Sequence, residues 1–329
     1  MSLDAAALLP EVDELEALIL VDNVTDMVSS VPEGVEQETA SLLRAGMKEL
    51  AGEHLCCAHF GLSLVLTARR GDVWRTVLFD GGPEGYAVER NGNRLGLDFG
   101  TIGGVVLSHG HWDHAGGLGR ALELIRESNG GRDVSFHLHP GMFRRRGIRH
   151  DDHVLPFRRL LDPGELAARG ARPIVTDRAD LAEDFFYVSG EIPRVTPYEQ
   201  GLPGHVAERE DGTWEEDRWI LDERFLAVRL KDRGIAVFTA CSHAGVVNVL
   251  KEAQRSFPGL PLHAVFGGFH LSGEEIEPII PDTVEDLKQF DLARIVPCHC
   301  TGWRAVSALH AAFGDRVVVP GAVGRRFRF

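Results

Sequence analysis

The stretch of sequence that decides the fold is Ser108-His109-Gly110-His111-Trp112-Asp113-His114-Ala115-Gly116-Gly117. It follows a short apolar run that predicts a buried strand, and it leads into a predicted helix. Residues two apart in an extended chain point to the same side, so His109 and His111 can bind one metal ion. Asp113 and His114 come after the bend and can reach a second ion nearby.

The alternative for this stretch is a loop in which polar residues gather by accident. Neutral histidines so close together need a ligand or solvent to satisfy their ring nitrogens, which favours a metal site. The spacing also differs from the His-Glu-x-x-His zinc motif, in which both histidines lie on one face of a helix. Imidazole and carboxylate ligands suit zinc, and they also suit manganese or iron.

Further polar side chains occur just past the carboxyl ends of other predicted strands. In open α/β sheets, ligands bind at this edge. If the strands are parallel neighbours, the side chains converge with His109 on one site. The residues in question are Asp80, Cys241, Ser242, His243, His270 and His299.

Short apolar strands alternate with amphipathic helices along the chain, which predicts an α/β protein with stretches of parallel sheet. We expect helices at Ala115–Glu127, Val246–Arg255, Thr283–Phe290 and Arg304–Phe313. We expect strands at Leu15–Val21, Leu62–Thr67, Val73–Phe79, Gly104–Leu107, Val134–Leu138, Phe225–Leu230, Ile235–Thr239, His263–Phe266, Arg294–Val296 and Val317–Val319.

The composition fits a globular protein with a sizeable core, because 44% of the residues are hydrophobic and 26% are charged. A net charge of −14 argues against a nucleic-acid or membrane surface and leaves room for a small anionic substrate. Five cysteines without a regular framework favour a reducing cytoplasm. We expect no membrane span and no signal peptide. The sequence leaves open whether the chain forms homo-oligomers.

The length of 329 residues allows two domains, but the pattern favours a single decorated domain over residues 1–329. The segment 141–212 is rich in proline and charge and has weak periodicity. We expect this segment to be an irregular insertion that packs over one end of the sheet as a lid or substrate-binding loop. A purely structural cover is the alternative.

The motif from His109 to His114, with Asp80 before two glycines, resembles the metallo-β-lactamase superfamily. Within it, the chain resembles most the branch of the dihydropterin–ribofuranosylaminobenzene-phosphate synthases and their hydrolase-like relatives. The resemblance extends from Leu18 to Phe329. It is carried by AHFGLSLVL, SHGHWDHAGGL, SGEIPR, ACSHAGVVNVL, VFGGFHLSG, PCHCTGWRA and the pair Asp222-Glu223.

This resemblance implies an αββα four-layer sandwich with metal ions at one edge. Asp80 matches an aspartate that orients a ligand without binding the metal itself. His299 matches the histidine ligand of the last strand. The full set of ligands implied by the resemblance is His109, His111, Asp113, His114 and His299.

The middle of the motif pattern departs from the family. Most members place a histidine before, and a bridging aspartate after, the strand that corresponds to Ile235–Thr239. Here Cys241 occupies the position of the bridging aspartate, and Asp222 lies where the earlier histidine is sought. We predict His243 as a metal ligand, with a helix-capping role as the alternative. Cys241 either replaces the bridging ligand or is a small buried apolar residue.

Three residues are candidates for contact with the substrate. His270 can position the substrate or donate a proton to the leaving group. Arg194, with Glu191 as its partner, is predicted to contact a phosphate group because of the SGEIPR motif. The run Arg144–Arg146 competes for this role, although such runs are more often a solvated face.

These features predict a metal-dependent hydrolase. One or two divalent ions, zinc first and manganese or iron as alternatives, would lower the pKa of water to about 7 and supply hydroxide. We expect Asp113, His270 and Asp80 to act in catalysis on phosphoesters, above all phosphodiesters. The first alternative is a synthase that joins a pterin diphosphate to a ribosyl-aminobenzene phosphate. The second is a non-catalytic metal or ligand sensor.

Overall fold

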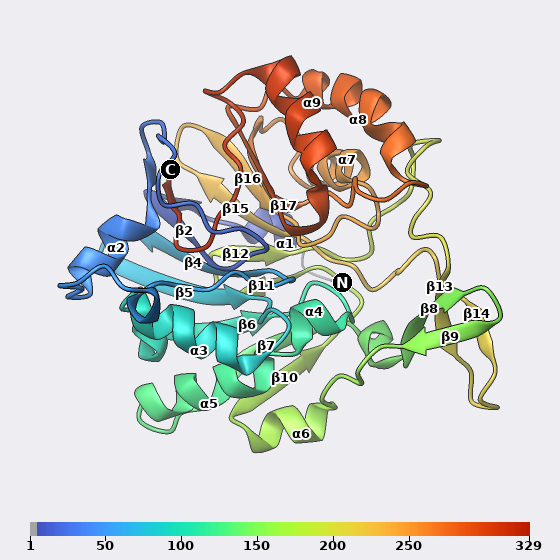
Figure 1. Cartoon of the computed structure of the whole chain (residues 1–329), viewed down its shortest axis with the longest axis horizontal. Coiled ribbons are helices and arrows are strands. Elements are labelled where there is room, and N and C mark those ends of the chain that lie inside the picture. The colour runs from blue at the N-terminus through green and yellow to red at the C-terminus, as the bar shows by residue number, and fades with distance from the viewer. Residues whose placement is uncertain (1–4) are drawn as a thin grey trace.

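Two large β-sheets lie face to face at the centre of the molecule, with helices on both outer faces (Figure 1). The structure is a computed structural model that describes residues 5–329. One apolar cluster fills the space between the sheets, and one further cluster lies beneath each helical layer. The fold is therefore the αββα sandwich that the sequence predicts.

Sheet B has the strand order β10-β7-β6-β5-β4-β2-β19-β3. Strands β5, β6, β7 and β10 run parallel, so their carboxyl ends lie at one edge of the sheet. Its strands are β10 (Ala171–Val175), β7 (Val134–Leu138), β6 (Ile102–Val106), β5 (Val73–Phe79), β4 (Ser63–Arg70), β2 (Glu14–Val21), β19 (Arg326–Arg328) and β3 (Val35–Glu36).

Sheet A has the strand order β11-β12-β15-β16-β17-β18, with β1 beside β15. Strands β16, β17 and β18 run parallel and bring three further carboxyl ends together. Its strands are β11 (Asp180–Ala182), β12 (Phe186–Val188), β15 (Leu226–Leu230), β16 (Gly234–Phe238), β17 (Leu262–Gly268), β18 (Arg294–Cys298) and β1 (Glu11–Val12).

Amphipathic helices form the two outer layers (Figure 1). α3 (Gly85–Arg94) and α5 (Leu118–Ser128) pack on sheet B, while α7 (Val246–Ser256), α8 (Ile280–Leu287) and α9 (Trp303–Phe313) pack on sheet A. In α5 the buried residues Leu118, Ala121, Leu122 and Ile125 follow the helical period, which gives the helix one apolar face. The shorter helices are α1 (Ala5–Leu8), α2 (Glu38–Arg44), α4 (Trp112–Ala115) and α6 (Pro163–Ala168).

Two expected elements differ in the structure. The helix expected over Ala115–Glu127 is divided into α4 and α5 at Gly116 and Gly117. A Cβ atom on Gly116 would lie 1.8 Å from the carbonyl oxygen of Pro83, so this close approach requires glycine. The strand expected at Val317–Val319 is only an isolated bridge between Val318 and Ile295.

The expectation of one irregular insertion over residues 141–212 is wrong. Helix α6 and strands β10, β11 and β12 lie within this segment but belong to the sandwich. Pro173 interrupts the strand signal of β10, and it is tolerated because β10 lies at the edge of sheet B. What remains outside the two large sheets is sheet C, with the order β14 (Trp214–Glu216), β13 (His205–Glu208), β8 (Arg146–His150) and β9 (His153–Pro156).

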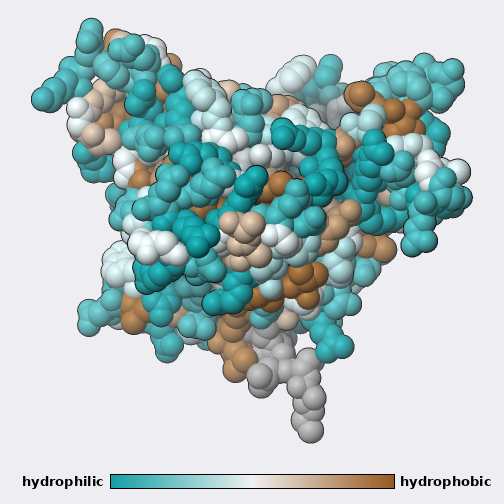
Figure 2. Space-filling model, turned by 90° about the horizontal axis from the view of Figure 1, so that it is seen from below, coloured by the Kyte–Doolittle hydropathy of each residue, from teal (hydrophilic) through white to brown (hydrophobic). Residues whose placement is uncertain are grey.

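Sheet C lies at one side of the sandwich (Figure 1). The face of the molecule seen from below is mainly hydrophilic, and its apolar residues form separate patches (Figure 2). Within residues 5–329, the helices lack the length and apolar character that a membrane crossing requires.

The packing between the two large sheets predicts a strong effect of Phe266→Ala. Phe266 of sheet A is fully buried, and its ring centroid lies 4.8 Å from that of Phe327 in sheet B. Because its removal leaves a cavity, we expect the free energy of unfolding to fall by about 3–5 kcal/mol in chemical denaturation. Leu50→Ala, at a residue that is 70% exposed, is the control and should change it by less than about 0.5 kcal/mol. A loss below about 1 kcal/mol for Phe266→Ala would contradict this account.

Candidate metal centre

The carboxyl ends of strands from both large sheets meet at one edge of the sandwich. Asp80 follows β5, His243 follows β16, His270 follows β17 and His299 follows β18. The convergence expected from the sequence is therefore present, and it joins the ends of two sheets. Asp80, His270 and His299 have left-handed backbone, with φ angles of 62°, 43° and 46°. Such strained residues are typical of sites where side chains must point in a fixed direction.

Cluster 1 consists of His109, His111 and His243, whose ligand atoms all lie within 4.8 Å of one another. All three side chains are buried. Within residues 5–329, neither Nε2 of His109 nor either ring nitrogen of His243 has a hydrogen-bond partner. Because buried polar atoms normally have partners, this cluster has the lone pairs that a cation needs.

Cluster 2 consists of Asp113, His114 and His299. Nε2 of His299 lies 3.3 Å, and Nε2 of His114 lies 3.8 Å, from Oδ2 of Asp113. Sγ of Cys241 lies 3.1 Å from Nε2 of His114 and within 4.8 Å of a ring nitrogen of His109. Cys241 therefore lies between the two clusters, at the position expected for a bridging ligand.

Asp80 holds the loop formed by residues 108–114. Both of its carboxylate oxygens are engaged by Ser108 or His114, so neither oxygen is free to bind a metal. Its Oδ2 accepts hydrogen bonds from Nδ1 of His114 and from Oγ of Ser108, both at 2.7 Å, and its Oδ1 accepts one from the Ser108 amide. Oγ of Ser108 in turn lies 2.8 Å from Nδ1 of His109. Because these contacts engage Nδ1 of His109 and His114, Nε2 of each ring is left to bind a metal. Residues that hydrogen-bond to a metal ligand commonly orient it in this way.

Asp22 and Asn23 play the same part for His299, and sequence reasoning missed both. Oδ1 of Asp22 accepts a hydrogen bond from the His299 amide at 2.8 Å, and Oδ1 of Asn23 lies 3.0 Å from Nδ1 of His299. Burial raises the pKa of Asp22 to about 6, although two backbone amides oppose this shift. The available signal was the position of Asp22 directly after strand β2, which matches the position of Asp80 after β5.

Asp222 does not complete the metal site, because its carboxylate is engaged elsewhere. Both of its oxygens pair with the buried guanidinium of Arg146, and Oδ2 also accepts a hydrogen bond from the Gly110 amide at 2.8 Å. The pKa of Asp222 is lowered because the attraction of Arg146 outweighs the effect of burial. Glu223 holds the other loop, since its carboxylate accepts hydrogen bonds from the amides of His243 and Ala244 at 2.7 Å.

The run Arg144–Arg146 forms ion pairs with acids of its own surroundings. Arg144 pairs with Asp217 and Glu215, and Arg145 pairs with Glu208. Arg146 is only 3% exposed and pairs with Asp217 as well as Asp222. The run is therefore neither a solvated face throughout nor a free phosphate clamp.

His205 of strand β13 lies beside His111 at the centre. No motif or spacing in the sequence predicted this position. Nε2 of His205 lies 3.0 Å from Nε2 of His111, and its Nδ1 lies 2.9 Å from the carbonyl oxygen of Asp217. Burial lowers the pKa of His205 to about 4.

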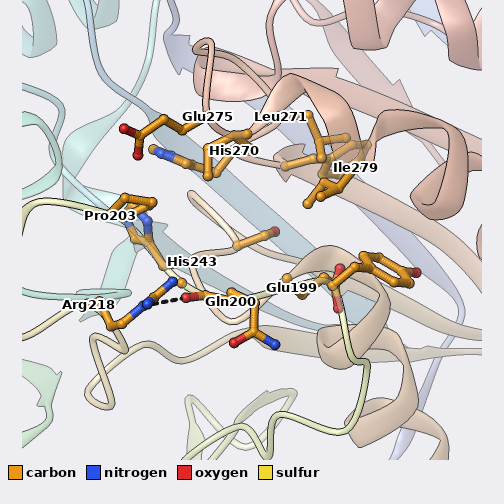
Figure 3. A pocket seen from close by; sticks show the side chains of 15 residues that line it. Glu199, Gln200, Pro203, Arg218, His243, His270, Leu271, Glu275 and Ile279 are labelled. Carbon is orange, nitrogen blue, oxygen red and sulfur yellow. Dashed lines mark hydrogen bonds between the residues drawn. The ribbon is translucent and has the colours of Figure 1, made fainter.

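A cavity of about 190 Å³ opens beside cluster 1 (Figure 3). His243 and His270 line it, and Arg218 lies on a different side from His270 (Figure 3). Nε of Arg218 donates a hydrogen bond to the Gln200 carbonyl at 2.8 Å, which holds the guanidinium in place. The remaining wall is partly apolar and includes Phe269, Leu271, Ile276 and Ile279.

Two predicted substrate residues lie elsewhere. Arg194 donates hydrogen bonds to the backbone carbonyls of Ile192, Trp219 and Ile220, so its guanidinium is engaged by the chain itself. Burial lowers the pKa of Arg194. Glu191 is exposed. The structure brings Arg218, rather than Arg194, to the cavity.

The electrostatics of the centre favour metal binding. Burial lowers the pKa of His109, His111 and His243 well below its usual value, and positively charged neighbours lower it further. The rings are therefore neutral, which is the form that binds metals. Burial opposes protonation of His114, but the carboxylates of Asp113 and Asp80 raise its pKa to about 9. Histidine-rich donors with one carboxylate and the thiols of Cys241 and Cys300 fit a divalent transition metal.

The αββα sandwich and its buried donor clusters define the class of the protein, and the chain has the metallo-β-lactamase fold. No protein-family model matches the sequence. An uncharacterized protein of Methanocaldococcus jannaschii is 30% identical over 244 residues, which cover 71% of this chain and 82% of that protein. The 7,8-dihydropterin-6-methyl-4-(β-D-ribofuranosyl)-aminobenzene-5′-phosphate synthase of the same organism is 25% identical over 259 residues, with coverage of 78% and 85%.

Solved structures agree on the fold. Tm1679, described as a metal-dependent hydrolase of the β-lactamase superfamily, has a TM-score of 0.67 at 23% identity, over 95% of this chain and 98% of that one. Unliganded yeast PDE1 has a TM-score of 0.56 at 12% identity, over 97% and 100%. At these identities the likeness shows a common fold, and the chemistry must be argued from the residues.

The contacts of Asp80 predict weaker metal binding in Asp80→Asn. The oxygen of the introduced amide can still accept the hydrogen bond of the Ser108 amide, but its NH₂ group then faces Nδ1 of His114. Nδ1 would have to accept, so the hydrogen of the His114 ring would move to Nε2, the nitrogen needed for the metal. We expect zinc affinity, measured by competition with a chelator, to fall by about 10–100-fold. Asp180→Asn, at a carboxylate that pairs with His137, is the control and should bind zinc as the wild type does. Equal affinity in Asp80→Asn would contradict this orienting role.

Proposed function

We propose that the protein is a metal-dependent hydrolase of small phosphoesters, with phosphodiesters preferred. The observation that carries the proposal is the pair of adjacent donor clusters, one of which borders a cavity that contains a fixed guanidinium. A divalent ion bound there would stabilise developing negative charge and provide a nucleophile at neutral pH.

The residues of the chain take the remaining roles. Arg218 binds an oxygen of the phosphate group and so orients the ester over cluster 1. His270 faces the same cavity, and its Nδ1 has no hydrogen-bond partner among residues 5–329. In this proposal the His270 ring donates a proton to the leaving oxygen. Asp113 contributes the carboxylate of cluster 2, and Asp80 keeps His114 and the Ser108 loop in position.

The donor set supports zinc over manganese or iron. Six imidazoles and the thiols of Cys241 and Cys300 supply donor atoms at the centre with a single carboxylate, and nitrogen and sulfur donors suit zinc better than manganese. All five cysteines are free, and Cys241 can act as a ligand only while it stays reduced. We therefore place the protein in the cytoplasm, with a small anionic molecule as its partner.

The second candidate is a synthase, which the name of the 25% identical relative favours. Two phosphorylated substrates would need several inward-facing cations. The cavity is small, and Glu199 and Glu275 line it together with Arg218. Burial raises the pKa of Glu199 to about 7, but this does not add a cation. The size and charge of the cavity therefore support one small phosphoester rather than two anionic substrates.

The direct test measures metal content and turnover together. We expect zinc-loaded wild type to hydrolyse a phosphodiester faster than a phosphomonoester or a lactone. His111→Ala should lose tightly bound zinc and reduce turnover by about 100-fold or more. His153→Ala, on the exposed strand β9, is the control.

Four results would overturn the proposal. Full activity in a metal-free His111→Ala protein would refute the role of the metal. Hydrolysis of the lactone alone would refute the phosphoester preference. Full zinc content without turnover would favour a sensor, and condensation of a pterin diphosphate with a ribosyl-aminobenzene phosphate would favour the synthase.

Arg218→Ala tests how the substrate is held. Loss of a charge-assisted hydrogen bond is worth about 1.5–3 kcal/mol, so KM for the phosphodiester should rise by about 10-fold or more. The kcat value should change much less, because the bond is present before and during the reaction. Arg209→Ala, which removes an exposed arginine in the turn between β13 and β14 that pairs with Glu215, is the matched control. An unchanged KM in Arg218→Ala would exclude this contact.

A further inference from the structure

The hydrogen bonds of His205 determine which nitrogen of His111 carries a hydrogen. Nδ1 of His205 lies 2.9 Å from the carbonyl oxygen of Asp217. A carbonyl oxygen only accepts, so Nδ1 of His205 is the donor, and Nε2 of the neutral ring is bare. This bare nitrogen lies 3.0 Å from Nε2 of His111. The hydrogen between the two rings therefore belongs to His111.

We propose that His205 is a positioning residue of the metal centre, which holds His111 in its Nε2–H form and leaves Nδ1 as the metal-binding atom. A neutral imidazole has one donor and one acceptor nitrogen, so fixing one nitrogen fixes the other. The partner of a metal-binding histidine commonly sets its tautomer and ring orientation in this way. Here that partner comes from sheet C.

A direct ligand role for His205 fits the geometry less well. Among residues 5–329, His205 belongs to no set of three donor atoms that lie within 4.8 Å of one another, whereas His111 does so with His109 and His243. The centroids of the His111 and His205 rings are 4.9 Å apart, a spacing that one hydrogen bond between the rings allows. His205 thus contacts His111 without sharing its set of three donor atoms.

A closed path of contacts holds His205 against the metal-binding loop. Asp217, whose carbonyl accepts from His205, pairs through Oδ2 with Nε of Arg146 at 2.9 Å. Arg146 also pairs with Asp222, and Asp222 accepts the hydrogen bond of the Gly110 amide. Sheet C is therefore linked to the loop at two adjacent residues, directly at His111 and through Asp222 at Gly110.

The surroundings protect the bond between the two rings. His205 is fully buried, and His111 is 5% exposed. The ring of Phe157 lies 5.2 Å from that of His111 and 5.8 Å from that of His205, centroid to centroid. Exclusion of water strengthens such a hydrogen bond and raises the penalty for losing its acceptor.

The test compares His205→Leu, which removes the acceptor, with His205→Gln, whose side-chain oxygen can accept from His111. His153→Leu, on strand β9 of the same sheet with a side chain 68% exposed, is the control. We expect zinc affinity to fall by about 10–100-fold in His205→Leu. It should recover for the most part in His205→Gln and stay unchanged in the control. Nitrogen-15 NMR of the imidazoles should find His111 as Nε2–H in the wild type and in His205→Gln.

The outcomes separate this inference from the proposed function on which it rests. Wild type that binds no zinc would refute the proposed function. Wild type that binds zinc while His205→Leu binds it equally well would refute only the role of His205, as would an Nδ1–H form of His111. If both variants lose affinity and change the visible spectrum of the cobalt-loaded protein alike, His205 is a ligand and the positioning role is wrong. Circular dichroism of the metal-free variants shows whether a loss of zinc affinity reflects unfolding. If His205→Leu is unfolded, the zinc affinity of His205→Gln decides whether His205 positions His111.

Discussion

Buried imidazole nitrogens without protein partners are the constraint on which the rest of this centre depends. Each unsatisfied buried polar group costs about 1–3 kcal/mol, so a fold that gathers several of them must hold them in place by other means. Asp80, Glu223 and Asp22 do this by accepting backbone amides of the metal-binding loops. The loops are thus fixed from behind, and the lone pairs of cluster 1 point to a common centre.

The same arrangement explains where the backbone is strained. A side chain at the carboxyl end of a strand can face the centre only if the chain turns at once, and this places Asp80, Ser242, His270 and His299 in left-handed conformations. Such residues cost of the order of 1–3 kcal/mol each and persist when their surroundings determine the conformation. The hydrogen bonds from the His299 amide to Asp22 and from the Ser242 hydroxyl to the Gly268 carbonyl supply this support.

The sequence could reveal the parts of the centre that follow from local order. The spacing of His109 and His111, and the position of His299 after an apolar strand, were enough to place these ligands at one edge. Residues that act through long-range contacts had no such signal. His205 is 94 residues from His111, and Asn23 is 276 residues from His299. The fold was predictable because its strands are continuous apolar runs, whereas β10 was hidden by the edge proline Pro173.

The acids near the centre are mostly engaged by the chain itself, so the net charge of the protein does not describe the site. The net charge of the chain is −14. Asp80 accepts hydrogen bonds from His114 and Ser108, and Asp222 is engaged by Arg146 and the Gly110 amide. Glu223 accepts backbone amides. Asp113 is the carboxylate that remains directed at the ligands of cluster 2. Neutral imidazoles do not cancel the charge of a cation, so an ion bound there would keep most of its own. Since Arg218 is accompanied by Glu199 and Glu275 in the lining of the cavity, the charge of a bound ion would dominate the local field at this edge.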